Sequence, residues 1–169
     1  MNQYVDPNDI PIGWANLAAC LNMDIDRLIE KCRINSFESV QTKEKYGSLR
    51  VYYDAEADND DGYRELSDLI NIYEAISENT CIYCGKYPVH MIEAGWISPV
   101  CETCYTDKRY AMKPYDEVRK DPLPTDHFVT IRKYSSDHGA VDRKLDLRPY
   151  IKRIAAYTAK HPITVTYDE

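Results

Sequence analysis

The sequence predicts an α+β fold, because segments of helical and of strand-like periodicity follow one another and two cysteine pairs stand between them. Of the 169 residues, 44% are hydrophobic and 29% are charged, which is typical of an ordered chain that buries a core. The pairs Cys81–Cys84 and Cys101–Cys104 are both CxxC motifs, and 16 residues separate them. They divide the chain into three expected parts, over 1–79, 80–106 and 107–169.

The first part, 1–79, is predicted to be a helical and β-hairpin unit. Apolar residues spaced as in a short helix run from Gly13 to Leu21, and Asp24 is placed to cap a second helix, so we expect a helical hairpin. Alternation over 37–53 around Gly47 predicts two antiparallel strands.

An acidic stretch over 54–61 is expected to be a solvated loop with a helix cap at its end, since it lacks the glycine and glutamate register of a calcium loop. An amphipathic helix should follow it, cover the hairpin and lead into the first cysteine pair. Its apolar positions are Tyr63, Leu66, Leu69, Ile70, Tyr73 and Ile76.

The central part, 80–106, is predicted to be a metal-binding module. Each CxxC turn directs two thiolates towards one centre, and two such turns supply the four sulfur ligands of a closed, structural Zn²⁺ site. A closed site leaves no position for water or substrate, which argues against zinc catalysis. The expected ligands are Cys81, Cys84, Cys101 and Cys104. Two disulfides or free buried thiols are the alternative.

The residues around these pairs fit a zinc ribbon or a treble clef. Gly85 follows the first pair where the turn needs a positive φ, and a short strand over 95–100 should deliver the second pair. A helix starting in Cys104–Ala111 would distinguish the treble clef from the ribbon. Cys20 and Cys32 are left over, and we expect each to be a small buried hydrophobe on a helix.

The last part, 107–169, is expected to be a small α/β extension. His127–Tyr134 alternates as a strand, and a helix should start at Asp146 or Leu147 with Pro149 in its first turn. Ile163–Tyr167 is β-branched and predicts a final strand.

Charge is distributed unevenly along the chain. The formal net charge is −7, with 8 basic and 18 acidic residues over 1–104 and 13 basic and 10 acidic residues over 105–169. Most basic residues of the second stretch form dispersed dibasic pairs, which are typical of a solvated surface and form no dense patch for nucleic acid. An acidic front portion favours a partner with a basic surface.

Tyrosine is unusually frequent, with 15 tyrosines against 2 phenylalanines. Tyr46, Tyr52 and Tyr53 gather on the hairpin, and Tyr105, Tyr110 and Tyr115 follow the second cysteine pair. Such side chains suit a protein interface or stacking on exposed bases, and equally the edge of a core.

Three segments stand out as motifs: Ile12-Gly13-Trp14, the run from Lys43 to Tyr52, and the CxxCG knuckle at Cys81. Together they resemble a set of small uncharacterised proteins from tailed phages and prophages, which have a KEKFGTLRFY-like segment followed by a cysteine knuckle. The resemblance covers about residues 10–104. It implies a phage-type accessory protein of the host-cell cytoplasm, and products of that kind often bind a host protein. Lys43, Lys45 and Arg50 match the motif, which assigns them no role.

Enzyme motifs fit the sequence poorly, so we expect a non-enzymatic protein. A zinc deaminase needs HxE and PCxxC, but His90 and Glu93, and Pro99 and Cys101, are each one residue out of register. The histidines are too scattered for an HNH-type nuclease, and no phosphate loop, nucleophile elbow or Rossmann glycine pattern is present in the sequence.

Two functions remain. The first is a protein-binding accessory factor, such as an inhibitor of a host defence system, that meets a basic partner surface with its acidic front and its tyrosines. The alternative is a zinc-ribbon nucleic-acid-binding regulator, whose binding would weaken with salt and depend on Lys108, Arg109, Lys113 or the later dibasic pairs.

The expected location is the cytoplasm, since paired CxxC motifs suit a reducing compartment. Met1–Asp9 is polar and acidic, unlike a signal peptide, and the sequence has no run of about eighteen apolar residues.

Overall fold

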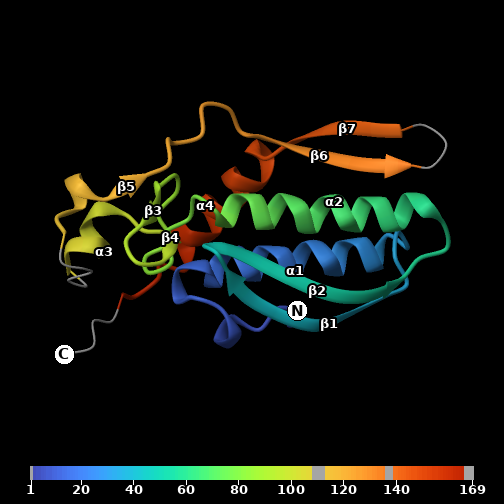
Figure 1. The fold of residues 1–169 in the computed structure, drawn as a ribbon. Helices are drawn as coiled ribbons and strands as arrows, with labels where there is room; N and C mark the ends of the chain where they lie inside the picture. Colours follow the sequence, from blue (N-terminus) through green and yellow to red (C-terminus); the bar gives the residue numbers. More distant parts are fainter. Residues whose placement is uncertain (1, 108–112, 136–138, 166–169) are drawn as a thin grey trace.

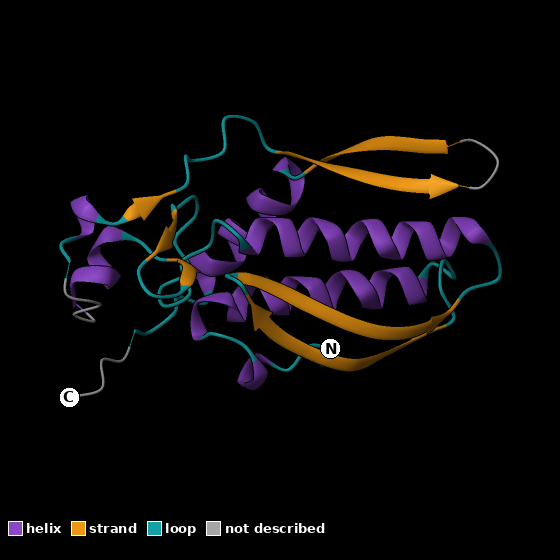
Figure 2. Ribbon diagram, viewed as in Figure 1, coloured by secondary structure: helices purple, strands orange, loops and turns teal. Residues whose placement is uncertain are grey.

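The computed structural model describes residues 2–107, 113–135 and 139–165, and it confirms a mixed helical and strand architecture (Figures 1 and 2). The helices are η1 (Pro7–Asp9), η2 (Ile12–Trp14), α1 (Ala15–Glu30), α2 (Asp60–Ser77), α3 (Glu102–Asp107), η3 (Tyr115–Glu117) and α4 (Arg148–Lys160). The strands are β1 (Ser36–Lys45), β2 (Ser48–Glu56), β3 (Met91–Glu93), β4 (Ile97–Pro99), β5 (Arg119–Lys120), β6 (Phe128–Ser135) and β7 (Gly139–Asp146).

One continuous helix, α1, stands where the sequence predicted a helical hairpin, so that prediction was wrong. Residues 15–30 contain neither proline nor glycine, and nothing in the local sequence interrupts the helix. Asp24 lies in the middle of α1 and caps no helix. Its side chain is buried and accepts hydrogen bonds from Tyr73 of α2 and Arg153 of α4. The role of Asp24 is therefore to make tertiary contacts rather than to cap a helix, as its local sequence suggested.

The β1–β2 hairpin and α2 are confirmed. Lys45 pairs with Ser48, so Tyr46 and Gly47 form the turn, and both have positive φ, 52° and 79°. The acidic stretch differs from the prediction because β2 continues to Glu56 and α2 begins at Asp60, which leaves only 57–59 as loop. Asn59 caps α2 by accepting a hydrogen bond from Gly62 N.

Helix α2 lies between two hairpins (Figure 1), with β1–β2 along one side and β6–β7 along the other. The main core forms where α1, α2 and β2 meet, and its fully buried side chains include Trp14, Leu21, Leu49, Leu66 and Tyr73. Helix α2 thus covers the first hairpin and ends close to the first cysteine pair, as predicted.

The C-terminal segments were predicted in part. The strand at His127–Tyr134 is confirmed as β6, and the helix is confirmed as α4, which begins at Arg148. Strand β7 was missed. No strand forms over 163–165, where the sequence predicted one, and residues 166–167 lie outside the described part of the chain.

The segment expected as one extension, 107–169, contributes to two cores. Leu147 is buried in the main core, with Tyr150, Ile151 and Ile154 of α4 packed against it. Val118 instead belongs to a second cluster with the cysteines. A hydrogen bond from the Asn16 side chain to the carbonyl of His161, 2.8 Å, fastens the end of α4 to α1. Residues of this segment therefore pack in both core clusters.

Within the part of the chain that the structure describes, every helix is too short or too polar to cross a membrane.

Candidate metal centre

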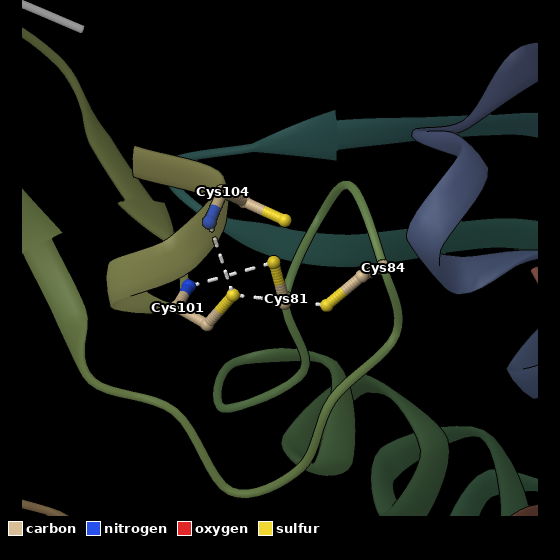
Figure 3. Close-up of side chains that lie close together, drawn as sticks. All are labelled: Cys81, Cys84, Cys101 and Cys104. Carbon is tan, nitrogen blue, oxygen red and sulfur yellow. Dashed lines mark hydrogen bonds between the residues drawn. The ribbon is translucent and has the colours of Figure 1, made fainter. Parts of the chain in front are cut away.

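The four cysteines of the two CxxC motifs converge (Figure 3), and β4 and α3, which adjoin the second pair, lie at one end of α1 and α2 (Figure 1). The first pair lies on the loop after α2, where Gly85 has the predicted positive φ of 77° and donates its N–H to the carbonyl of Cys81 at 3.0 Å. The second pair follows the predicted strand, which is β4, and Cys104 lies within α3. Pro99 links the two halves, because its carbonyl accepts a hydrogen bond from Ile82 N at 3.0 Å.

The cysteine sulfurs are close enough to share one metal ion. One Sγ from each of the four residues lies within 4.8 Å of all the others. Three of the side chains, those of Cys81, Cys101 and Cys104, are buried, and Cys84 is partly exposed. Sulfurs around a tetrahedral Zn²⁺ stand about 3.8 Å apart, as follows from a Zn–S distance of about 2.3 Å. The Cys84 and Cys101 sulfurs are 3.7 Å apart. The cluster could therefore bind a metal ion without large rearrangement.

Backbone groups prepare these sulfurs for negative charge. Cys101 N donates to the sulfur of Cys81 and Cys104 N donates to the sulfur of Cys101, each at 3.4 Å (Figure 3). Hydrogen bonds of this kind stabilise thiolates over thiols.

The protons of the metal-free cluster are shared unequally. A hydrogen bond from Cys84 lowers the pKa of Cys81, whereas donating that hydrogen bond raises the pKa of Cys84. Burial raises the pKa of Cys104 to about 12. Metal ligation needs thiolates, so binding at neutral pH would displace protons from Cys84 and Cys104.

A small apolar core supports the cluster. Val89, Ile92, Val100, Tyr105 and Val118 are buried around the cysteines. Strands β4, β3 and β5 form a three-stranded sheet in that order, so residues 119–120 close one edge of the unit. Tyr105 packs edge-on against Tyr115 at 5.3 Å. We call the two CxxC turns, this apolar core, strands β3, β4 and β5, and the turn that joins β3 to β4 the cysteine module.

The N-terminal segment is seated directly on the first CxxC turn. Gly13 N donates to the carbonyl of Ile82 at 2.8 Å, and Trp14 Nε1 donates to the carbonyl of Thr80 at 2.9 Å. A Cβ on Gly13 would lie only 2.0 Å from the carbonyl oxygen of Cys81, so no side chain fits there. The sequence motif Ile12-Gly13-Trp14 contains both residues but assigns neither of them a role. A glycine beside a buried tryptophan was the only local signal of this close approach.

The remaining candidate residues lie away from the cluster. Cys20 is buried, and burial raises the pKa of its thiol to about 11. Cys32 is exposed in the turn after α1 with a φ of 55°, so the prediction of a buried hydrophobe was wrong for this residue. The turn carries its side chain away from the core that the apolar neighbours Leu28 and Ile29 contact.

The motif residues of the hairpin make surface contacts. Lys43 Nζ stands over the Tyr52 ring and Lys45 Nζ over the Tyr46 ring, at 5.4 and 5.7 Å from the ring centroids. Arg50 reaches Glu74 of α2 at 4.0 Å.

The tyrosines divide between surface and core. Tyr46 and Tyr52 are exposed, Tyr53 stacks on Phe37, and Tyr105 is buried. Tyr110 lies outside the described residues, as do Lys108 and Arg109.

Comparison with protein-family models, with curated proteins and with solved structures finds no match to this chain.

Proposed function

We propose that Cys81, Cys84, Cys101 and Cys104 bind one structural Zn²⁺. The convergence of four sulfurs within 4.8 Å carries this proposal. The backbone N–H groups aimed at two of the sulfurs support it. Helix α3, which carries Cys104, favours a treble clef over a plain zinc ribbon.

On this basis we propose that the protein is a zinc-stabilised, non-enzymatic accessory protein that binds another protein. A closed four-sulfur site offers no open coordination position for a substrate, which supports a structural role for the metal. A net charge of −7 supports a partner with a basic surface. The resemblance of the Ile12-Gly13-Trp14, Lys43–Tyr52 and CxxCG segments supports a phage-type protein that inhibits a host defence system.

The ion pairs over residues 105–169 make nucleic-acid binding the second choice. After Cys104, every arginine that the structure describes is paired with a carboxylate. These arginines are Arg119, Arg132, Arg143, Arg148 and Arg153. A carboxylate next to a cation cancels much of the attraction between that cation and a phosphate, so these arginines offer nucleic acid little net positive charge.

The metal proposal is tested by metal analysis of purified protein and of two cysteine variants. We expect one Zn²⁺ per chain in the parent protein and none in Cys104→Ser, whose central region should unfold. Cys32→Ser is the matched control, since Cys32 is exposed and lies outside the cluster, and it should retain the metal. Full thermal stability of the parent protein in chelator would refute a structural metal.

The binding proposal is tested by a pull-down from nuclease-treated bacterial lysate, beside gel-shift titrations with mixed DNA and RNA at two salt concentrations. A stoichiometric protein band without a gel shift is the expected result. A salt-sensitive shift without a band would instead assign the protein to the nucleic-acid-binding class.

A further inference from the structure

A groove of about 560 Å³ runs between the turn of the β1–β2 hairpin and the turn that joins β3 to β4. Figure 1 shows the turn end of this hairpin beside β4. Glu44 and Tyr46 line the groove from the hairpin, and Glu93, Trp96 and Ile97 line it from the cysteine module. Two segments about fifty residues apart in the sequence thus form one surface feature.

The groove displays large side chains that a folded protein usually covers. Relative exposure is 72% for Tyr46, 42% for Trp96 and 39% for Ile97. Tyrosine and tryptophan are the residues that most often dominate the energy of protein interfaces, since they bury much area and lose little entropy. Two such side chains and an isoleucine around one hollow are therefore a candidate contact surface.

The turn holds the backbone of Tyr46 in place. Tyr46 has a φ of 52°, which a bulky side chain rarely adopts, in a two-residue turn where asparagine is the preferred residue. Glu44 Oε1 accepts the N–H of Gly47 at 2.6 Å. A Cβ on Gly47 would lie 2.6 Å from Sδ of Met91, so the turn lies directly against β3. An unfavoured backbone conformation at an exposed aromatic residue points to a binding role for that residue.

The charged groups that line the groove are both carboxylates, those of Glu44 and Glu93. Two cations already contact side chains of the lining. Lys45 lies over the Tyr46 ring, and Arg119 pairs with Glu93 at 3.2 Å, with 75% of its own side chain exposed. An exposed pair of this kind contributes little stability, so a cation from a partner can replace Arg119 at small cost. The lining as a whole is suited to a group that is both cationic and flat.

We propose that this groove is the docking site for a protein segment that presents an arginine side chain next to an apolar residue. The inference rests on the proposed protein-binding function and gives it a site. A guanidinium stacks on aromatic faces and forms forked hydrogen bonds with a carboxylate, so Tyr46, Trp96 and Glu93 offer it complementary contacts. The apolar neighbour would pack on Ile97. Lysine fits less well, because its ammonium neither stacks nor makes a forked pair.

A peptide selection followed by NMR tests the proposal. Random dodecapeptides displayed on particles are selected on immobilised, zinc-loaded protein, and enriched peptides are titrated into the ¹⁵N-labelled protein. The chain has 2 tryptophans, so each indole N–H gives one signal. We expect enriched peptides to share an arginine beside an apolar residue and to shift the Trp96 signal. The signal of Trp14, which is buried and donates to Thr80, should stay in place.

Variants of both molecules complete the test. Replacing the peptide arginine with lysine, or changing Tyr46→Asn or Glu93→Gln in the protein, should each weaken binding at least about tenfold. Tyr63→Ala is the matched control, because Tyr63 is 44% exposed on α2 and lies outside the groove lining. It should bind as the parent does.

Three results would overturn the groove assignment. Peptides that bind without shifting the Trp96 signal would refute the docking site while leaving protein binding intact. Peptides without arginine that respond to the groove variants would refute the stated partner chemistry. A single-stranded oligonucleotide that shifts the Trp96 signal and competes with the peptides would identify the groove as a surface for stacking bases. If no peptide is enriched and the pull-down also gives no band, both the groove and the protein-binding function are refuted.

Discussion

Gly13→Ala tests whether the cysteine module depends on the N-terminal segment. The substitution adds one methyl group at a position where the Cβ would stand 2.0 Å from the carbonyl oxygen of Cys81 and 2.5 Å from the carbonyl carbon of Ile82. Both contacts are with backbone, which cannot rotate away as a side chain does. The two segments must therefore separate by more than an ångström.

The cost of that separation has two parts. Overpacking a tight contact costs about 2 kcal/mol. The movement also weakens two hydrogen bonds, from Gly13 N to Ile82 and from Trp14 Nε1 to Thr80, each with a net contribution of about 1 kcal/mol. We therefore expect Gly13→Ala to lower the free energy of unfolding by about 3 kcal/mol or more.

Urea unfolding of the zinc-loaded protein, followed by circular dichroism, measures this loss. Gly95→Ala is the matched control, since Gly95 has a φ of 88° and no atom within 4 Å of its ideal Cβ position. That variant should lose only the backbone cost of a left-handed alanine, about 1 kcal/mol. Equal losses in the two variants would refute the close approach at Gly13. Weaker zinc retention in Gly13→Ala alone would extend the result to the metal site.

Three further predictions concern charge and backbone conformation. Burial raises the pKa of Glu74, so the folded state holds the carboxyl proton more tightly than the unfolded state does. The stability that this proton contributes is fully present below the ordinary pKa of 4.5 and is lost as pH rises through the pKa of the folded state. Glu74→Gln should therefore raise the urea midpoint at neutral pH and leave it unchanged in acid, and a lower midpoint at neutral pH would contradict this reasoning. Arg153→Met removes a partner of the buried Asp24 and should lower the free energy of unfolding by about 2 kcal/mol. Adding Asp24→Asn should restore much of that loss, which a comparison of the unfolding free energies of the single and double variants measures. Tyr46→Asn relieves the positive φ and should stabilise the hairpin by about 1 kcal/mol in thermal unfolding while it weakens partner binding, whereas a destabilised variant would show that the ring contributes to folding.

Sequence patterns predicted the parts of this fold that depend on neighbouring residues. The apolar spacing of α2 and the alternation of β1 and β2 are local, and each element lies where its pattern placed it. The CxxC spacing brought the four sulfurs together because each turn fixes its own pair of ligands. The strand before Cys101 and the positive φ of Gly85 follow from the same local geometry.

Features that depend on distant residues could not be predicted in this way. Asp24 looks like a helix cap until Arg153 approaches it across 129 positions, after which it is a buried partner in the middle of α1. The side chain of Cys32 is directed to solvent by the backbone turn at the end of α1, which the apolar pattern of the helix does not encode. Strand β7 was missed because its sequence lacks the β-branched alternation of β6. Its extended conformation depends on backbone pairing with β6.

The three motif segments named from the sequence lie together in the structure. Both Ile12-Gly13-Trp14 and the hairpin run from Lys43 to Tyr52 contact the cysteine module, which contains the CxxCG knuckle. Gly13 is seated on the CxxC turn, and Gly47 is packed on Met91 and Ile97 of the cysteine module. The groove between Tyr46 and Trp96 therefore exists only while the cysteine module is folded. We expect the folding of that module to require the metal. Linkage then makes metal binding and partner binding reciprocal, so a peptide that binds the groove should slow zinc loss to a chelator. Zinc release measured with and without a selected peptide checks this, and a release rate that the peptide leaves unchanged would show that the groove does not depend on the metal.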